Sequence, residues 1–334
     1  MSLASKIDIS ENILRNRGRI LDILLTDKSK TTKRRQHNII WATNSYKRYG
    51  KDYSPKSQIK HEQITGLNGK RIQPRAAKSK EEQTARTKNK AEVFTPLKIV
   101  KQMNLSIDWA SKNFPATDKN WVDYVKELRL EITCGEAPFI SSRYNPTANT
   151  GAIIIPKNRV GFLDRKLQVL SEFTKTKKDW LNYAEIALKA SYGYEWQGDN
   201  LLIARENILL TLDDFYKDFC KNKLELKSKQ SLTDEQLEYF AEIISWNIFQ
   251  MDGLKYIIPM SCRHETNIIH GELTLFTDTP DIVKKYECEG CKFNRPNMHN
   301  GKYAKIMDWN TGKSVKFITL LDNQKEKRVN YKIN

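Results

Sequence analysis

The sequence contains no run of about 18 apolar residues, roughly the minimum for a membrane-spanning helix. Its first residues also lack the positive charges and the following apolar stretch of a secretory signal. We therefore expect a soluble, cytoplasmic protein without a membrane partner. Five cysteines, an odd number, indicate reduced thiols or a metal site in that compartment rather than a disulfide framework.

Acidic residues are scarce in the first part of the chain, which carries most of the net charge of +17. Residues 1–90 contain 22 lysines and arginines against 8 acidic residues, whereas the remaining chain is near balance. Concentrated positive charge is typical of proteins that bind a polyanion, because each neutralised phosphate releases counterions. We expect residues 1–90 to form a basic N-terminal extension that contacts DNA; the alternative is a solvated arm that serves solubility.

The spacing of apolar residues predicts an α/β chain. Helical spacing predicts helices at 97–109, 163–173, 180–189, 201–219 and 235–244. Apolar runs predict strands at 130–131, 152–156, 192–195 and 245–252. Thr95 is placed to cap the first of these helices. The polar residues 76–90 predict a linker or an exposed helix, and 141–180 an insertion between the first two strands of the sheet.

Four short segments carry the motifs on which the functional prediction depends. In residues 130–139 an apolar strand runs into an acidic turn around Gly135, which is how a doubly wound sheet presents backbone to a nucleotide-like ligand. Upstream lies Ala-Glu-Val-Phe-Thr-Pro at 91–96, and downstream come 192–195 and 243–252. Alone, each segment is also compatible with an ordinary turn between a strand and a helix.

In this order, the four segments resemble the gamma-class adenine-N6 DNA methyltransferases, especially the methylase portion of type IIG restriction-modification enzymes. The match is closest to chains called restriction endonuclease subunit M, and it covers residues 34–317. The resemblance implies a Rossmann-like, S-adenosylmethionine-dependent methyltransferase sheet in residues 91–334 that acts on DNA. The cofactor-binding residues that it implies are Phe94, Thr95, Glu131, Cys134, Gly135, Glu195 and Asp252.

The resemblance also assigns roles to three of these residues. Phe94 would pack beside the cofactor, Glu195 would accept hydrogen bonds from the ribose hydroxyls, and Asp252 would accept one from the adenine amino group. By position alone, Phe94 could equally be a core phenylalanine. Each carboxylate could equally cap a helix or pair with a lysine.

Two features depart from the family pattern. Gly135 is followed by Glu136 and Ala137 where the family repeats glycine, and we expect Glu136 to bring negative charge toward the carboxylate of the cofactor. The family's catalytic string, Asn or Asp followed by Pro-Pro and an aromatic residue, is absent; Asn-Pro-Thr-Ala at 145–148 is the nearest match. The catalytic residues are therefore unknown, and a second chain could supply them.

Two other functions stay open. The chain could be a catalytically inactive DNA-binding or cofactor-sensing protein of the same fold. It could also be a nuclease, because Asp213 or Asp214 with Glu225 and Lys227 has the order of a metal-dependent nuclease site. The helical pattern around these acids favours solvated side chains instead.

A cysteine- and histidine-containing insert at 260–300 predicts a structural metal site. The insert combines one C-x-H, formed by Cys262 and His264, with one C-x2-C, formed by Cys288 and Cys291. Zinc prefers this ligand set, and His299 follows further along the chain. The alternative is free thiols in a loop.

Overall fold

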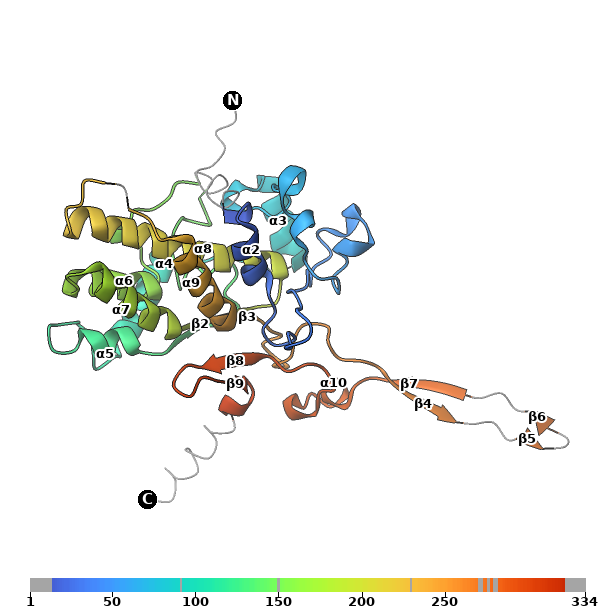
Figure 1. Ribbon diagram of the computed structural model, residues 1–334. Helices are drawn as coiled ribbons and strands as arrows, with labels where there is room; N and C mark the ends of the chain where they lie inside the picture. Colours follow the sequence, from blue (N-terminus) through green and yellow to red (C-terminus); the bar gives the residue numbers. More distant parts are fainter. Residues whose placement is uncertain are drawn as a thin grey trace, which may run out of the picture.

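The structure is a computed structural model, which describes residues 14–90, 92–148, 151–228, 230–269, 273–274, 277–278 and 282–321 (Figure 1). Its centre is a parallel three-stranded sheet of β1 (Arg129–Glu131), β2 (Ser191–Glu195) and β3 (Ile248–Gln250) in the order β1-β2-β3. The register places Leu130 beside Tyr192, and Tyr194 beside Phe249. Among the described strands, β1 therefore has one free edge.

Helices connect the strands, as parallel pairing requires. α6 (Phe162–Phe173) and α7 (Lys177–Lys189) separate β1 from β2, and α8 (Gly198–Asp218) and α9 (Asp234–Asn247) separate β2 from β3. Two of these helices begin at threonine caps. The Thr176 side chain accepts a hydrogen bond from the Asp179 amide, and Thr233 forms a capping box with Gln236.

The remaining elements precede or follow this unit. The other helices are α2 (Gly18–Leu25), α3 (Lys80–Lys90), α4 (Leu97–Trp109), α5 (Trp121–Lys126) and α10 (Glu289–Lys292). The other strands are β4 (Glu265–Ile269), β5 (Leu273–Thr274), β6 (Thr277–Asp278), β7 (Ile282–Tyr286), β8 (Lys305–Asp308) and β9 (Lys313–Lys316). In Figure 1, β4 and β7 form an antiparallel ribbon that projects away from the body.

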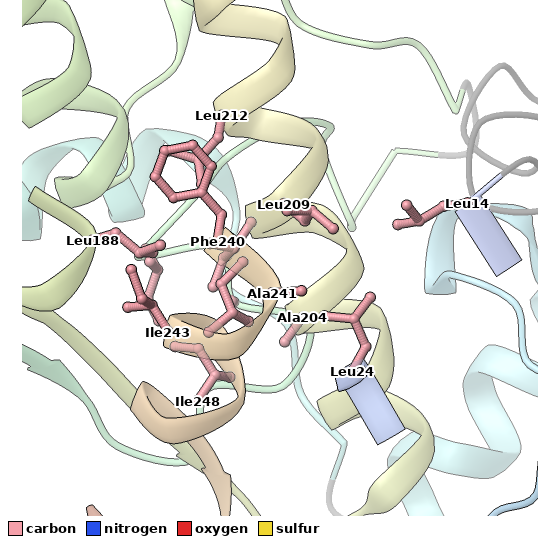
Figure 2. Close-up of a cluster of buried hydrophobic side chains, with 14 of the residues drawn as sticks. Leu14, Leu24, Leu188, Ala204, Leu209, Leu212, Phe240, Ala241, Ile243 and Ile248 are labelled. Atoms are coloured by element: carbon pink, nitrogen blue, oxygen red, sulfur yellow. The ribbon is translucent and has the colours of Figure 1, made fainter. Parts of the chain in front are cut away.

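The main hydrophobic core lies between the sheet and the helices. Figure 2 shows side chains of α2, α7, α8 and α9 gathered there, among them Leu24, Leu188, Leu209 and Phe240. α2 packs directly against α9, so residues 18–25 share the core of the helical unit. Trp41 is completely buried in the same cluster. The N-terminal part of the chain thus contributes apolar side chains to the core as well as positive charge.

A second cluster covers the other face of the sheet, but only over two of its strands. Tyr194 of β2 and Phe249 of β3 pack against Ala304, Ile306 and Phe317 from the C-terminal segment. On β1 this face is open, and Leu130 is 42% exposed.

The predicted α/β class is confirmed as a mixed α/β structure with a small parallel sheet, and helices occupy the predicted insertion. α4 has the predicted bounds, although its N-cap is Pro96 rather than Thr95. Residues 152–156 contain no strand, because the chain turns into a 3-10 helix at Pro156–Asn158. β3 is shorter than expected because α9 continues to Asn247. Within the described residues, no helix is long and apolar enough to cross a membrane.

One buried ion pair holds the N-terminal part of the chain to α8. The Arg15 guanidinium donates to both carboxylate oxygens of Glu206, at 2.6 and 2.8 Å, and to the Gly69 and Ile72 carbonyls. Glu206→Ala removes the carboxylate from this buried cation, so we expect the free energy of unfolding to fall by about 3–5 kcal/mol. Urea denaturation followed by circular dichroism measures this loss.

Glu238→Ala is the matched control, because its partner Arg19 is 81% exposed and exposed pairs contribute little. Equal stability losses for the two variants would contradict the importance of the Arg15–Glu206 pair.

Candidate functional site

A pocket of about 910 Å³ lies at the carboxyl ends of β1 and β2. Its wall is formed by residues 92–95, the α4 side chains Met103, Asn104 and Ile107, residues 128–135 with 138–139, and the start of the chain after β2. In doubly wound sheets, ligands bind at this edge. Six of the seven predicted cofactor residues line it: Phe94, Thr95, Glu131, Cys134, Gly135 and Glu195.

The turn after β1 is held by backbone bonds and by the end of β2. The Cys134 amide donates to the Tyr194 carbonyl at 2.8 Å, and the Gly135 amide donates to Glu195 Oε2 at 2.8 Å. Gly135 has φ +56°, which suits glycine, and a Cβ there would contact the Phe94 ring at 3.4 Å. The turn therefore brings its backbone directly against the aromatic ring.

Glu195 links the two strand ends. Its other oxygen, Oε1, accepts a hydrogen bond from the Gln197 amide at 3.0 Å. Burial raises the pKa of Glu195 to about 7, although the hydrogen bonds from the Gln197 and Gly135 amides oppose this shift. The carboxyl therefore changes its ionisation near neutral pH.

The pocket wall contains several buried oxygen acceptors that find no hydrogen-bond partner among the described residues. They are Glu92 Oε1, Asn104 Oδ1, Glu131 Oε2, Gln197 Oε1 and Asn200 Oδ1. A buried acceptor left in this state costs about 1–3 kcal/mol, so a cluster of them requires an explanation. A side-chain movement that exposes these oxygens to the pocket would let a ligand with hydrogen-bond donors or positive charge satisfy them.

Glu131 is the most perturbed of these acceptors. Burial raises its pKa well above the usual range; the Phe139 and Ile140 amides oppose this shift, while the nearby charge of Glu195 adds to it. A cation in the pocket would favour the ionised form of both carboxyls.

Three residues of the pocket wall were not predicted from the sequence: Asn104, Gln197 and Asn200. Gln197 and Asn200 stand directly after a strand that ends in Glu195, and this position was a usable signal. Asn104 had no such signal. It lies on α4, and its Nδ2 donates to the Phe139 and Val160 carbonyls.

The structure corrects the expectation for Glu136. Its carboxylate does not line the pocket: Oε1 accepts from the Arg75 amide at 2.7 Å and Oε2 from the Tyr144 hydroxyl at 2.6 Å. These partners hold the charge away from the pocket. Ala137 takes the left-handed conformation, with φ +62°, in place of the second glycine.

Asp252 lies outside the pocket wall. Its Oδ1 accepts hydrogen bonds from the Leu254 and Lys255 amides, at 3.0 and 3.2 Å, and so closes the turn after β3. This turn carries Lys255 to within 3.5 Å of Cys291 Sγ. The residue predicted to contact adenine thus connects the sheet to the C-terminal segment.

Four side chains of the C-terminal segment form a cluster that could hold a metal ion. The ligand atoms of Cys262, Cys288, Cys291 and His299 all lie within 4.8 Å of one another. His299 Nδ1 is 3.6, 3.6 and 3.7 Å from the three sulfur atoms. Tetrahedral zinc, with bonds of about 2.0–2.3 Å, would separate its ligand atoms by about 3.5–3.8 Å.

His299 takes the place predicted for His264. His264 is exposed just before β4 and lies outside the cluster. His299 is buried, its amide donates to the Tyr303 hydroxyl at 3.1 Å, and a Cβ on Gly290 would approach His299 Nδ1 to 2.6 Å. The chain is therefore folded tightly around His299.

The acids considered for a nuclease site have structural partners. Asp214 forms ion pairs with Arg143 and Arg159, and Asp213 accepts from the Ser231 hydroxyl and the Leu232 amide. Neither belongs to a possible metal-binding group within the described part of the chain.

Comparison of the chain with protein-family models, with curated proteins and with solved structures finds no match. Membership of the methyltransferase family therefore stays a prediction from the sequence motifs. The pocket and the cluster provide the chemistry on which a function can be proposed.

We expect the cluster to retain one metal ion per chain, because three thiolates and an imidazole at these distances match a tetrahedral site. Mass spectrometry of metal content would measure it. His299→Ala and Cys288→Ser should lose the metal, and His264→Ala, the matched control, should keep it. A purified protein that contains no metal and keeps its fold when a chelator is added would contradict the site.

Proposed function

We propose that the pocket binds S-adenosylmethionine and that the chain is the cofactor-binding part of an adenine-N6 DNA methyltransferase in a restriction-modification system. The observation that carries this proposal is the set of buried acceptors without partners on the pocket wall. We also propose zinc as the metal of the Cys3His cluster, because zinc prefers this ligand set in structural sites.

The charges of the pocket favour a methyl donor over a phosphate-bearing cofactor. S-adenosylmethionine presents a sulfonium, an ammonium group, ribose hydroxyls and an amino group, all of which suit acceptors. Among the described residues, Arg129 is the one cationic side chain on the wall; it forms ion pairs with Asp108 and Glu127, although its buried Nε and Nη1 atoms make no hydrogen bond of good geometry. The Gly135 amide, which could bind a phosphate, already donates to Glu195. A phosphate would therefore meet carboxylates where it needs donors.

The size and shape of the pocket agree with this ligand. A volume of about 910 Å³ falls within the roughly 300–1,000 Å³ that is usual for small-molecule sites. The Phe94 ring beside Gly135 offers an apolar surface for a flat base.

Calorimetric titration with S-adenosylmethionine tests the proposal. We expect Glu131→Gln to weaken binding at least about 10-fold, because it removes a carboxylate from the cation site. Asp252→Asn is the control and should bind as the wild type does, since Asp252 lies outside the pocket wall. Affinity should also rise from pH 6 to pH 8, because a bound cation favours the ionised form of Glu195, whose pKa is about 7.

Absence of binding, or tighter binding of ATP than of S-adenosylmethionine, would contradict this assignment. If Asp252→Asn abolished binding, the result would instead support the adenine contact that the family resemblance implies for Asp252.

The methyl-transfer step requires a partner in this proposal, because the sequence has no Asn-Pro-Pro-aromatic string. The free edge of β1 supports a second chain. In a doubly wound sheet the ligand crevice lies between neighbouring strands, and parallel sheets are covered on both faces. Leu130 and Ile132, 42% and 64% exposed, line the pocket along this edge. A strand added along β1 would bury them and bring catalytic residues to the ligand.

We expect the chain alone to transfer no methyl groups to DNA, and its complex with the product of the adjacent gene to be active. The double variant Leu130→Lys with Ile132→Lys should abolish this activity. Leu254→Lys, at an exposed leucine elsewhere, should not. Radiolabelled methyl transfer measures both. Because Leu130 and Ile132 also line the pocket, the double variant is also titrated with S-adenosylmethionine, and retained binding would assign the loss to the partner surface. Transfer by the isolated chain would exclude the need for a partner, and a cofactor-bound complex that never methylates DNA would favour the inactive, cofactor-sensing alternative.

A further inference from the structure

The surface beside the Cys3His cluster presents an aromatic ring between cations. Phe293 follows α10 and is 51% exposed. Lys292 Nζ lies 5.1 Å, and Arg295 Cζ 5.7 Å, from the centre of its ring. About half of the Phe293 side chain is open to solvent, where a base can stack on it while neighbouring cations bind the phosphates.

The backbone fixes this ring close to the cluster. The Cys291 and Lys292 amides donate to the Cys288 carbonyl at 2.9 and 3.0 Å, and the Arg295 amide donates to the Gly290 carbonyl at 3.0 Å. The turn that carries Phe293 is thus the same turn that supplies two of the four cluster residues. Its geometry depends on the cluster, which makes the aromatic surface pre-organised.

Further cations flank the cluster residues in the sequence. Arg263 and Lys302 are exposed on neighbouring segments, and neither these nor Lys292 and Arg295 form an ion pair with a carboxylate within the described residues. Two exposed acids, Glu287 and Glu289, lie on the same segment. Next to the cluster residues in the sequence, these four cations outnumber the two exposed acids.

By contrast, several cations of the N-terminal part have internal partners. Arg15 binds Glu206, Arg17 binds Asp234, and Lys28 binds Glu242. Their charge is partly neutralised before any ligand arrives. Other N-terminal cations, among them Lys33, Arg34 and Arg35, are exposed and form no ion pair within the described residues, so what distinguishes the cations around the cluster is the aromatic ring between them.

The cluster is also attached to the edge of the sheet at which the pocket opens. β3 ends at Gln250, and the following turn places Lys255 beside Cys291. Since the carboxyl ends of parallel strands share one edge, the turn that reaches the cluster leaves the sheet at the edge where the pocket opens.

We propose that this surface, formed by Phe293 with Lys292, Arg295, Arg263 and Lys302, binds single-stranded or locally unpaired DNA. The Phe293 ring stacks on a base, and the four cations bind adjoining phosphates. The choice of DNA as partner rests on the proposed function. Its test, however, requires neither cofactor nor methyl transfer.

The experiment measures fluorescence anisotropy of a labelled 20-nucleotide DNA strand, and of the matching duplex, with the full-length protein at several salt concentrations. We expect tighter binding of the single strand. Phe293→Ala should weaken it about 5- to 100-fold, the usual effect of losing one stacked base. Lys292→Gln with Arg295→Gln should lower the salt slope by about 1–2.

Matched controls separate this surface from general charge and aromatic effects. Tyr239→Ala removes an exposed aromatic side chain from α9, and Lys175→Gln with Lys178→Gln removes two exposed lysines near α7. Both should bind as the wild type does. Phe293→Trp keeps an aromatic face, so it should retain single-strand binding even if Phe293→Ala folds poorly.

Wild-type affinity of Phe293→Ala for the single strand would overturn the proposal, as would equal losses in the controls or a preference for duplex. Phe293→Ala should also bind S-adenosylmethionine normally. A failure of DNA binding at this surface is thereby distinguishable from a failure of the cofactor site.

Discussion

The contact between the Glu195 carboxylate and the Gly135 amide is the constraint on which the pocket depends. It joins the end of β2 to the turn after β1, across a sheet of only three described strands. Burying a carboxyl is unfavourable unless backbone amides compensate, and here they come from Gly135 and Gln197. Glu195 also lines the pocket. Architecture and ligand chemistry are therefore combined in one side chain, and burial raises its pKa to about 7.

Much of the pocket could be predicted from local sequence, because its residues follow strands in short motifs. The turn at Gly135, the acid at Glu195 and the helix after Pro96 are all specified by neighbours in the chain. Residues whose positions depend on distant partners could not be predicted. Glu136 was expected to face the ligand, but its partners Arg75 and Tyr144 come from other segments.

The metal cluster shows the same limit. The spacing of Cys288 and Cys291 identified a turn, and Cys262 a third thiol, but spacing alone favoured the adjacent His264 over His299. The choice is made by the fold around Tyr303, which fixes His299. Counting charges in the sequence likewise could not show which cations form ion pairs. The basic N-terminal residues include cations with internal partners, whereas the cations around the cluster lie in a part of the chain whose net charge is near zero.

The cluster lies at the base of the β4–β7 ribbon, so the ribbon and the residues at its base are under different structural constraints. Cys262 and Cys288 are 26 residues apart and meet at 3.6 Å, so the intervening chain forms a closed loop that begins and ends at one point. Closure entropy grows only with the logarithm of loop length, about 0.6 kcal/mol for each doubling. Insertions or substitutions between these cysteines would therefore lower the stability of the rest of the protein only slightly. The ribbon is thus a place where the chain can accept insertions, whereas substitution of the residues that close its base would remove ligand atoms of the cluster.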